Sequence, residues 1–227
     1  MYQTADKDWP SEFARIIRCE ACTNAMDPNL LRDNLENVPQ PGYIGQRYRE
    51  SGVLLVGQNP GTPKSLAPID PPYTRALRAL RDESTPERYV ELLQVMRGVI
   101  PQWPIHGSYF PLAECDLALD DIAYLNVVRC RTTKDRAPGR TLVRQCTAIH
   151  FDRWFKLLAP RVVVFIGKWA YERASGHAKG AGVPCAFINR ERSLSSQERR
   201  ANRAEVIALV RKYRGTSVPS KPSDEDA

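Results

Sequence analysis

The stretch VLLVGQNPG at residues 53–61 decides the fold of this chain. It opens with four uninterrupted apolar residues, which is typical of a strand buried on both faces of a sheet, and a loop rich in glycine follows. Further runs of this character lie at residues 123–128, 162–166 and 183–188. We therefore predict four strands of one buried sheet.

Segments with helical period separate these strands. They cover residues 11–26, 73–81, 86–98, 141–158, 168–174 and 196–214. Strands that alternate with helices predict a single α/β domain, with a central four-stranded parallel sheet and helices on both faces. Because ligands of such sheets bind beyond the carboxyl ends of the strands, the loops that follow Val56, Val128, Ile166 and Ile188 are the places to look for a site.

Composition sets further bounds. A chain of 227 residues can bury one sizeable core, and we expect a domain over residues 1–214 with a disordered tail at 215–227. No apolar run approaches the roughly 20 residues that span a bilayer, and no signal peptide is evident, so we expect a cytoplasmic protein without membrane contact. The net charge of +7 suits a polyanionic partner such as nucleic acid, although a basic soluble protein without such a partner would have the same composition.

Four of the six cysteines form a pattern. Cys19 and Cys22 are separated by two residues, and Cys130 and Cys146 lie more than a hundred residues further on. In a reducing cytosol such thiols indicate metal binding or buried packing and argue against disulfides. A quartet from two distant segments favours either an iron–sulfur cluster or a structural zinc, and the residues alone leave both open.

Two asparagines lie where chemistry is expected. Asn59 belongs to the loop Gly57–Gly61, which is either a plain turn or a ligand-facing loop. Asn126 stands within an otherwise apolar strand, where an amide needs hydrogen-bond partners. Its partners are either the protein itself or a ligand, and its amide could match the carbonyl and imide N–H of a pyrimidine.

Several motifs occur together along the chain in a characteristic order. They are the paired cysteines, a Gly-x-x-Pro-Gly loop, the string Asn-Val-Val-Arg-Cys at 126–130, a cysteine in the next helix, and PRVVVFIG at 160–167. This order resembles the iron–sulfur branch of the uracil-DNA glycosylases, from about Cys19 to Tyr213. The Gly-x-Asn-Pro-Gly form of the loop is instead similar to the mismatch-specific and single-strand-selective branches. The chain therefore resembles one branch in its cysteines and another in its catalytic loop.

The resemblance implies a cofactor. Cys19, Cys22, Cys130 and Cys146 match the ligands of a structural 4Fe-4S cluster, and no other cofactor is expected. The remaining Cys115 and Cys185 would then be ordinary buried thiols.

The resemblance also implies roles for single residues. Gln58 would hold the scissile nucleotide, Asn59 would position the attacking water, and Asn126 would read the base. Tyr73 matches an aromatic that stacks on the flipped base, with a core aromatic as the alternative. Lys168 is similar to positions near the DNA backbone, or is a solvated lysine at a helix start.

The fourth loop departs from the family pattern because its His-Pro-Ser motif is missing. Asn189 could donate an amide hydrogen bond in place of the histidine. Arg190 and Arg192 would grip phosphate and Leu194 could wedge into the duplex, unless this is simply a charged loop that caps the last helix.

These patterns predict a monomeric, monofunctional repair glycosylase that flips uracil out of DNA and hydrolyses its N-glycosidic bond, leaving an abasic site. Two alternatives stay open. One is a glycosylase-fold protein that binds uracil or damaged DNA without turnover, and the other is a zinc-containing nucleic-acid-binding protein. The range of bases, the strand preference and the role of the insert at residues 88–119 are left undecided by the sequence.

Overall fold

The computed structural model describes residues 8–31, 38–61, 70–102, 110–189 and 195–215. The predicted tail lies outside these ranges except for Gly215, so the tail and the domain boundary stay predictions. Among the described residues, none of the helices is both long and apolar enough to cross a membrane.

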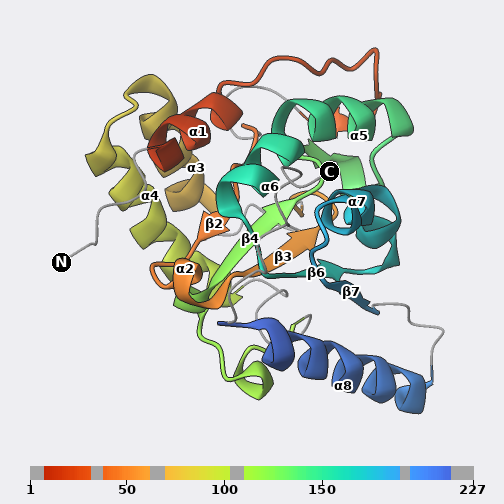
Figure 1. Cartoon of the computed structure of the whole chain (residues 1–227). Helices are drawn as coiled ribbons and strands as arrows, with labels where there is room; N and C mark the ends of the chain where they lie inside the picture. Colours follow the sequence, from red (N-terminus) through yellow and green to blue (C-terminus); the bar gives the residue numbers. More distant parts are fainter. Residues whose placement is uncertain (1–7, 32–37, 62–69, 103–109, 190–194, 216–227) are drawn as a thin grey trace, which may run out of the picture.

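A mixed sheet forms the centre of the molecule (Figure 1). Its strands, in spatial order, are β2 (Tyr43–Ile44), β4 (Ile122–Asn126), β3 (Val53–Gly57), β6 (Val162–Ile166) and β7 (Cys185–Ile188). The last four are parallel to one another, which confirms the predicted parallel strands. The predicted fold class is therefore confirmed, and β2 adds a short antiparallel edge strand beside β4 that was not predicted. A strand of two residues is too short to show a period in the sequence.

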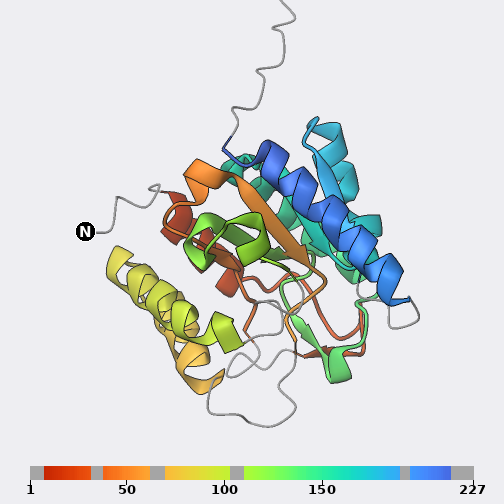
Figure 2. The ribbon, with the colours of Figure 1, turned by 90° about the horizontal axis from the view of Figure 1, so that it is seen from below.

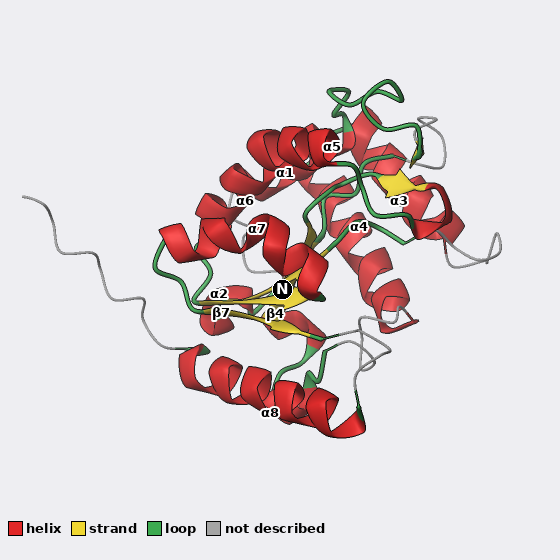
Figure 3. Ribbon diagram, turned by 90° about the vertical axis from the view of Figure 1, so that its right-hand side faces the viewer, coloured by secondary structure: helices red, strands yellow, loops and turns green. Residues whose placement is uncertain are grey.

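Helices cover both faces of the sheet, as predicted. Figure 3 shows α8 (Ser196–Tyr213) on one side and α5 (Arg140–Cys146), α6 (Asp152–Leu158) and α7 (Lys168–Gly180) on the other. The π-helical turn η5 (Thr147–Phe151) joins α5 directly to α6, so the predicted helix at 141–158 is confirmed with a local widening. At the start of α8, Ser195 and Glu198 form a reciprocal capping box.

Three further helices pack at the other side of the molecule from α8 (Figure 2). They are α1 (Asp8–Ile17), α3 (Asp70–Asp82) and α4 (Pro86–Val99). The ring of Phe13 joins α1 to its neighbours, with centroids 5.0 Å from Tyr89 on α4 and 5.4 Å from Trp154 on α6. Helix α1 ends at Ile17, so the prediction that this helix runs through the first cysteine pair was wrong.

Short elements complete the fold. They are α2 (Tyr48–Ser51), the 3-10 turns η1 (Ile100–Gln102), η2 (Ala113–Cys115), η3 (Leu119–Asp121) and η4 (Thr133–Asp135), and the strands β1 (Leu30–Leu31) and β5 (Arg131–Thr132). The two strands pair antiparallel in a small second sheet. This pairing ties the segment that follows Cys22 to the segment that follows Cys130.

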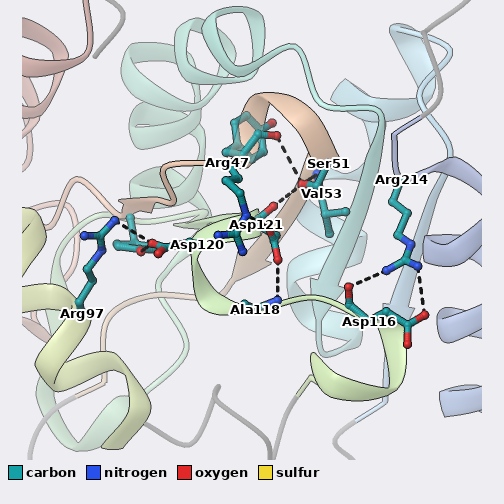
Figure 4. Close-up of polar contacts among 11 residues, drawn as sticks. Arg47, Ser51, Val53, Arg97, Asp116, Ala118, Asp120, Asp121 and Arg214 are labelled. Carbon is teal, nitrogen blue, oxygen red and sulfur yellow. Dashed lines mark hydrogen bonds and ion pairs between the residues drawn. The ribbon is translucent and has the colours of Figure 1, made fainter. Parts of the chain in front are cut away.

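Polar side chains fasten the edge of the sheet where β3 and β4 begin (Figure 4). Asp121 accepts hydrogen bonds from Arg47 Nε at 2.7 Å and from the backbone N–H of Ala118 at 2.7 Å. Arg97 Nη2 lies 2.8 Å from Asp120 Oδ1, and Arg214 Nη2 lies 3.0 Å from Asp116 Oδ2. These contacts stabilise the amino edge of the sheet. The loops that follow the parallel strands lie at the opposite, carboxyl edge.

Candidate functional site

Asn126 is the last residue of β4 and lies at the carboxyl edge of the sheet. Its side chain is 3% exposed, and its Oδ1 accepts a hydrogen bond from the Tyr124 hydroxyl at 2.8 Å. Tyr124 reaches it because residues two apart on a strand share a face. With the hydroxyl donating to Oδ1, the Nδ2 group of Asn126 is left for another acceptor.

Gly57 makes room for this pair on the neighbouring strand. Gly57 and Asn126 are register partners of β3 and β4. A Cβ atom at Gly57 would lie 2.5 Å from Asn126 Oδ1 and 2.6 Å from the Tyr124 hydroxyl, both far inside van der Waals contact. The absence of a side chain at Gly57 is therefore a condition for the observed position of the Asn126 amide.

The variant Gly57→Ala is expected to displace the Asn126 amide and so to lower any activity that depends on this amide by about 10- to 100-fold, in line with the cost of misplacing a reacting group by an ångström. Unfolding free energy should fall by only about 1–3 kcal/mol, as for overpacking in a core. Single-turnover rates and urea unfolding measure the two effects. Gly176→Ala is the matched control, since a Cβ at that helical glycine meets nothing within 4 Å. Equal activity in the two variants would contradict this role for Gly57.

The loop after β3 brings Asn59 to the same edge. The carbonyls of Gly57 and Gln58 accept hydrogen bonds from the N–H groups of Val127, at 2.9 Å, and Val128, at 3.0 Å. The loop therefore runs beside the segment that follows Asn126. Gln58 and Asn59 are both partly exposed, and the Asn59 Nδ2 donates to Thr132 Oγ1 at 3.0 Å. Asn59 is thus held and still accessible, as a ligand-facing group must be.

Asn189 follows directly after β7 at this edge. Its backbone N–H donates to Oδ1 of Asn202 at 2.7 Å, and Asn202 Nδ2 donates to the carbonyl of Phe187 at 3.0 Å. The Asn202 side chain on α8 therefore binds the backbone on both sides of Ile188. This clamp fixes where β7 ends and where Asn189 begins the fourth loop.

Within the described ranges, the other predicted site residues make no side-chain hydrogen bond to Asn59 or Asn126. Lys168 is exposed as the first residue of α7. Tyr73 on α3 is 1% exposed, so its ring lies in the core, and its proposed stacking on a base stays a prediction. Arg190, Arg192 and Leu194 lie outside the described residues, and their proposed contacts with DNA stay predictions.

The predicted cysteine ligands come from three segments that the fold ties together. Pairing of β1 with β5 joins the first segment to the second. Asp27 joins the first to the third, because its Oδ2 accepts a hydrogen bond at 2.8 Å from the N–H of Gly139, the N-cap of α5. Burial works to raise the pKa of Asp27, but the N–H groups of Gly139 and Asn29 outweigh it and lower that pKa.

Cys146 lies at the meeting point of these segments. Its side chain is 4% exposed, and its Sγ accepts a hydrogen bond at 3.3 Å from the N–H of Arg129, the residue before Cys130. Burial raises the pKa of the Cys146 thiol to about 12, although the charge and the backbone N–H of Arg129 act to lower that pKa. The thiol is therefore neutral without a metal, and a bound metal would have to displace its proton.

The Arg129 guanidinium is buried beside Cys146 and is 1% exposed. Its Nη1 donates to the carbonyl of Pro41 at 3.1 Å, whereas Nε and Nη2 have no hydrogen-bond partner among the described residues. Burial lowers its pKa to about 10, which leaves it charged at neutral pH. A buried cation is costly without an anion, and a group bound by thiolates would supply negative charge here.

The described residues do not bring three His, Cys, Asp or Glu side chains together around one metal ion. The predicted iron–sulfur ligands are therefore not confirmed. The donor chemistry still suits a cluster, since a cluster spreads its four thiolates over several irons and the orphaned guanidinium of Arg129 lies next to Cys146. Of the other two thiols, Cys115 is buried as predicted, whereas Cys185 is partly exposed.

His150 lies in η5 near the same arginine and is 2% exposed. Neither of its ring nitrogens has a hydrogen-bond partner among the described residues. Burial, together with the charges of Arg129 and Arg15, lowers the pKa of His150 to about 3. The imidazole is therefore neutral in the folded protein throughout the physiological range.

This lowered pKa predicts a pH-dependent stability. Between the unfolded value near 6.5 and the folded value near 3, the unfolded chain binds the extra proton, so stability is lost as the pH falls through this window. The loss amounts to about 1.4 kcal/mol per pH unit, or about 2 kcal/mol between pH 7 and pH 5. Urea unfolding at pH 7 and pH 5 should show this loss of unfolding free energy in the wild type and not in His150→Leu. Parallel pH profiles would refute it.

The fold defines an α/β protein, and in proteins with such a sheet the ligand binds beyond the carboxyl ends of the parallel strands. The family model of the Uracil DNA glycosylase superfamily matches residues 45–214, and the chain belongs to that superfamily. Membership supports a glycosylase-type hydrolase that acts on DNA. The match begins after Cys22, so it does not distinguish the iron–sulfur branch from the others. A comparison with curated proteins gave no match.

Sequence reasoning missed the side chains that orient the two amides. Tyr124 could have been found, because it stands two residues before Asn126 on a predicted strand. Thr132 and Asn202 carried no signal, since neither belongs to a motif. Thr132 is 73 residues from Asn59 in the chain, and only the fold brings the two together.

Proposed function

We propose that the chain is a monofunctional uracil-DNA glycosylase, which extrudes uracil from DNA, hydrolyses its N-glycosidic bond and leaves an abasic site. The observation that supports this most is the buried Asn126 amide, oriented by Tyr124 beside the Gly57–Gly61 loop, in a chain of this superfamily. Such an enzyme needs one group that reads the base and another that directs water.

Asn126 supplies the reading in this proposal. The uracil edge offers the O4 acceptor and the N3–H donor. The Nδ2 group of Asn126 would donate to O4, and the second lone pair of Oδ1, which the Tyr124 hydroxyl leaves free, would accept from N3–H. Cytosine presents an amino donor in place of O4, which would face the Nδ2 donor of Asn126. The fixed orientation of the amide therefore favours uracil over cytosine.

The chemical step builds positive charge on the sugar and negative charge on the departing uracil. Asn59 would hold the water that attacks C1′, and Gln58 would hold the nucleotide. Backbone N–H groups of the Gly57–Gly61 loop and the amide of Asn189 would donate to the uracil anion. Since uracil is a tolerable leaving group, no strong general base is required.

Binding of DNA would fall to groups around this edge. Lys168, Arg190 and Arg192 are the proposed phosphate contacts, and Leu194 is the proposed wedge. A role for Tyr73 in stacking would require a movement that exposes its ring, since that ring is 1% exposed. Phosphate contacts of this kind make binding fall steeply with salt.

Cys19, Cys22, Cys130 and Cys146 would hold a 4Fe-4S cluster. When bound, the cluster would serve as a structural cross-link, and no catalytic step passes through it. The ties already present between the three cysteine segments support this assignment. Zinc in the same place is the alternative, and the colour of the purified protein separates the two, because iron–sulfur proteins are brown.

The test is incubation of the protein with single-stranded and duplex oligonucleotides that carry uracil, hypoxanthine, xanthine or a thymine mismatch, followed by alkali. Strand breaks at uracil would support the proposal, and their pattern would define the base range and strand preference. No break, with a control glycosylase active on the same DNA, would refute it. Because the fourth loop lacks His-Pro-Ser, binding without turnover is the second candidate, and uracil-dependent gel shifts without breaks would favour it.

A further inference from the structure

Asn59 is held by a threonine that no motif marks. Asn59 Nδ2 donates to Thr132 Oγ1 at 3.0 Å, and Thr132 Oγ1 donates in turn to the carbonyl of Arg136 at 2.5 Å. The threonine side chain is fully buried, whereas Asn59 is partly exposed. The partly exposed Asn59 amide is thus held by the buried Thr132 hydroxyl.

The geometry fixes the orientation of the Asn59 amide. A threonine hydroxyl has one proton, and here that proton is committed to the Arg136 carbonyl. The oxygen of Thr132 can therefore only accept from Asn59, which selects the NH2 end of the amide. Among the described residues, no group donates to Asn59 Oδ1. The carbonyl end of the amide is left as an acceptor at the accessible side.

We propose that Thr132 is a positioning residue that turns the Asn59 carbonyl toward the attacking water, an inference that rests on the proposed function. The carbonyl would accept one O–H of the water, so a lone pair of the water oxygen is directed at C1′. That oxygen bonds to C1′ as the C1′–N1 electron pair leaves with uracil, and the water proton passes to solvent. With the amide reversed, its NH2 group would donate to the water lone pair and compete with attack.

The backbone around Thr132 makes this a rigid support. Thr132 is the last residue of β5 and pairs with Leu30 of β1. The N–H of the next residue, Thr133, donates to the carbonyl of Asn29 at 2.8 Å. Thr132 also stands two residues after Cys130, a proposed cluster ligand. One hydroxyl therefore connects the cysteine-bearing segment with the proposed water-positioning amide.

The test compares Thr132→Val, which keeps the shape and removes the hydroxyl, with Thr132→Ser, which keeps the hydroxyl. Single-turnover rates on uracil DNA should fall by about 10- to 100-fold in Thr132→Val and stay within about threefold of wild type in Thr132→Ser, the range expected when a reacting group loses its alignment. DNA affinity should be unchanged in both. Wild-type activity in Thr132→Val, an equal loss in both variants, or a loss confined to affinity would overturn the inference.

A double-mutant cycle with Asn59→Ala makes the test specific for action through Asn59. If Thr132 acts only by orienting that amide, Thr132→Val should lower the single-turnover rate in the wild-type background but not in the Asn59→Ala background. The slow Asn59→Ala reactions are followed for hours with enzyme in excess over DNA. Equal losses in both backgrounds would assign Thr132 a general structural role instead. Failure of the proposed function is recognised separately, because the wild type itself would then be inactive.

Discussion

Replacement of Asn126 by leucine is expected to lower kcat/KM on uracil-containing DNA by about 10³-fold, comparable with the loss of one essential hydrogen-bond donor in an active site. Leucine has a similar volume, so the shape of the pocket wall is kept while both hydrogen bonds to the base are lost. The Tyr124 hydroxyl also loses its acceptor, which should cost about 1–3 kcal/mol of unfolding free energy. Steady-state kinetics and urea unfolding measure the two effects.

Tyr124→Phe is the matched control for this variant. It removes the hydroxyl that orients the amide but keeps Asn126 itself, so its loss of activity should be much smaller. Discrimination between uracil and cytosine should weaken in Tyr124→Phe, because the Asn126 amide can then rotate by about 180° and exchange its oxygen and nitrogen. An Asn126→Leu protein with more than about a tenth of wild-type activity would contradict the assignment, since loss of an essential donor costs far more.

If the proposed metal is present, replacement of Cys146 by alanine is expected to remove it and to lower the free energy of unfolding by more than about 4 kcal/mol, as the loss of a structural metal does. Cys146 is buried where three segments meet, so without the cross-link the segment that contains Cys19 and Cys22 loses one of its anchors. The Arg129 cation would also lose the proposed anionic partner. Iron and sulfide analysis, the visible spectrum and urea unfolding measure these effects.

Cys115→Ala is the matched control, because Cys115 is a fully buried thiol outside the proposed quartet. It should keep its metal and lose only the packing of one small side chain, about 1 kcal/mol. Unchanged metal content in Cys146→Ala would exclude this cysteine as a ligand. Stoichiometric zinc in a colourless wild type would replace the cluster by a zinc site.

The four parallel strands could be predicted because each is a short apolar run. Burial on both faces requires such a composition in β3 and β6, whereas β7 is only partly buried. The strands β1, β2 and β5 could not, since two residues carry no period. Their pairing depends on contacts between distant segments, such as Leu30 with Thr132. The end of α1 at Ile17 was also missed.

The position of the candidate site followed from the same rule, because the loops after parallel strands share one edge. Asn59 was found in the loop that follows an apolar run, and Asn126 as an amide within an apolar run. Their orientation was not, because an amide looks the same in the sequence whichever way it faces. That orientation comes from the hydroxyls of Tyr124 and Thr132, and Thr132 reaches Asn59 only through the fold.

We propose that the edge of the sheet with Asn59 and Asn126 releases a base from DNA. The most direct measurement is mass-spectrometric detection of free uracil after incubation of the wild type with a labelled oligonucleotide that contains a single uracil. We expect one equivalent of uracil per strand, with the strand intact until alkali is added. Tight uracil-dependent binding without any free uracil would contradict it.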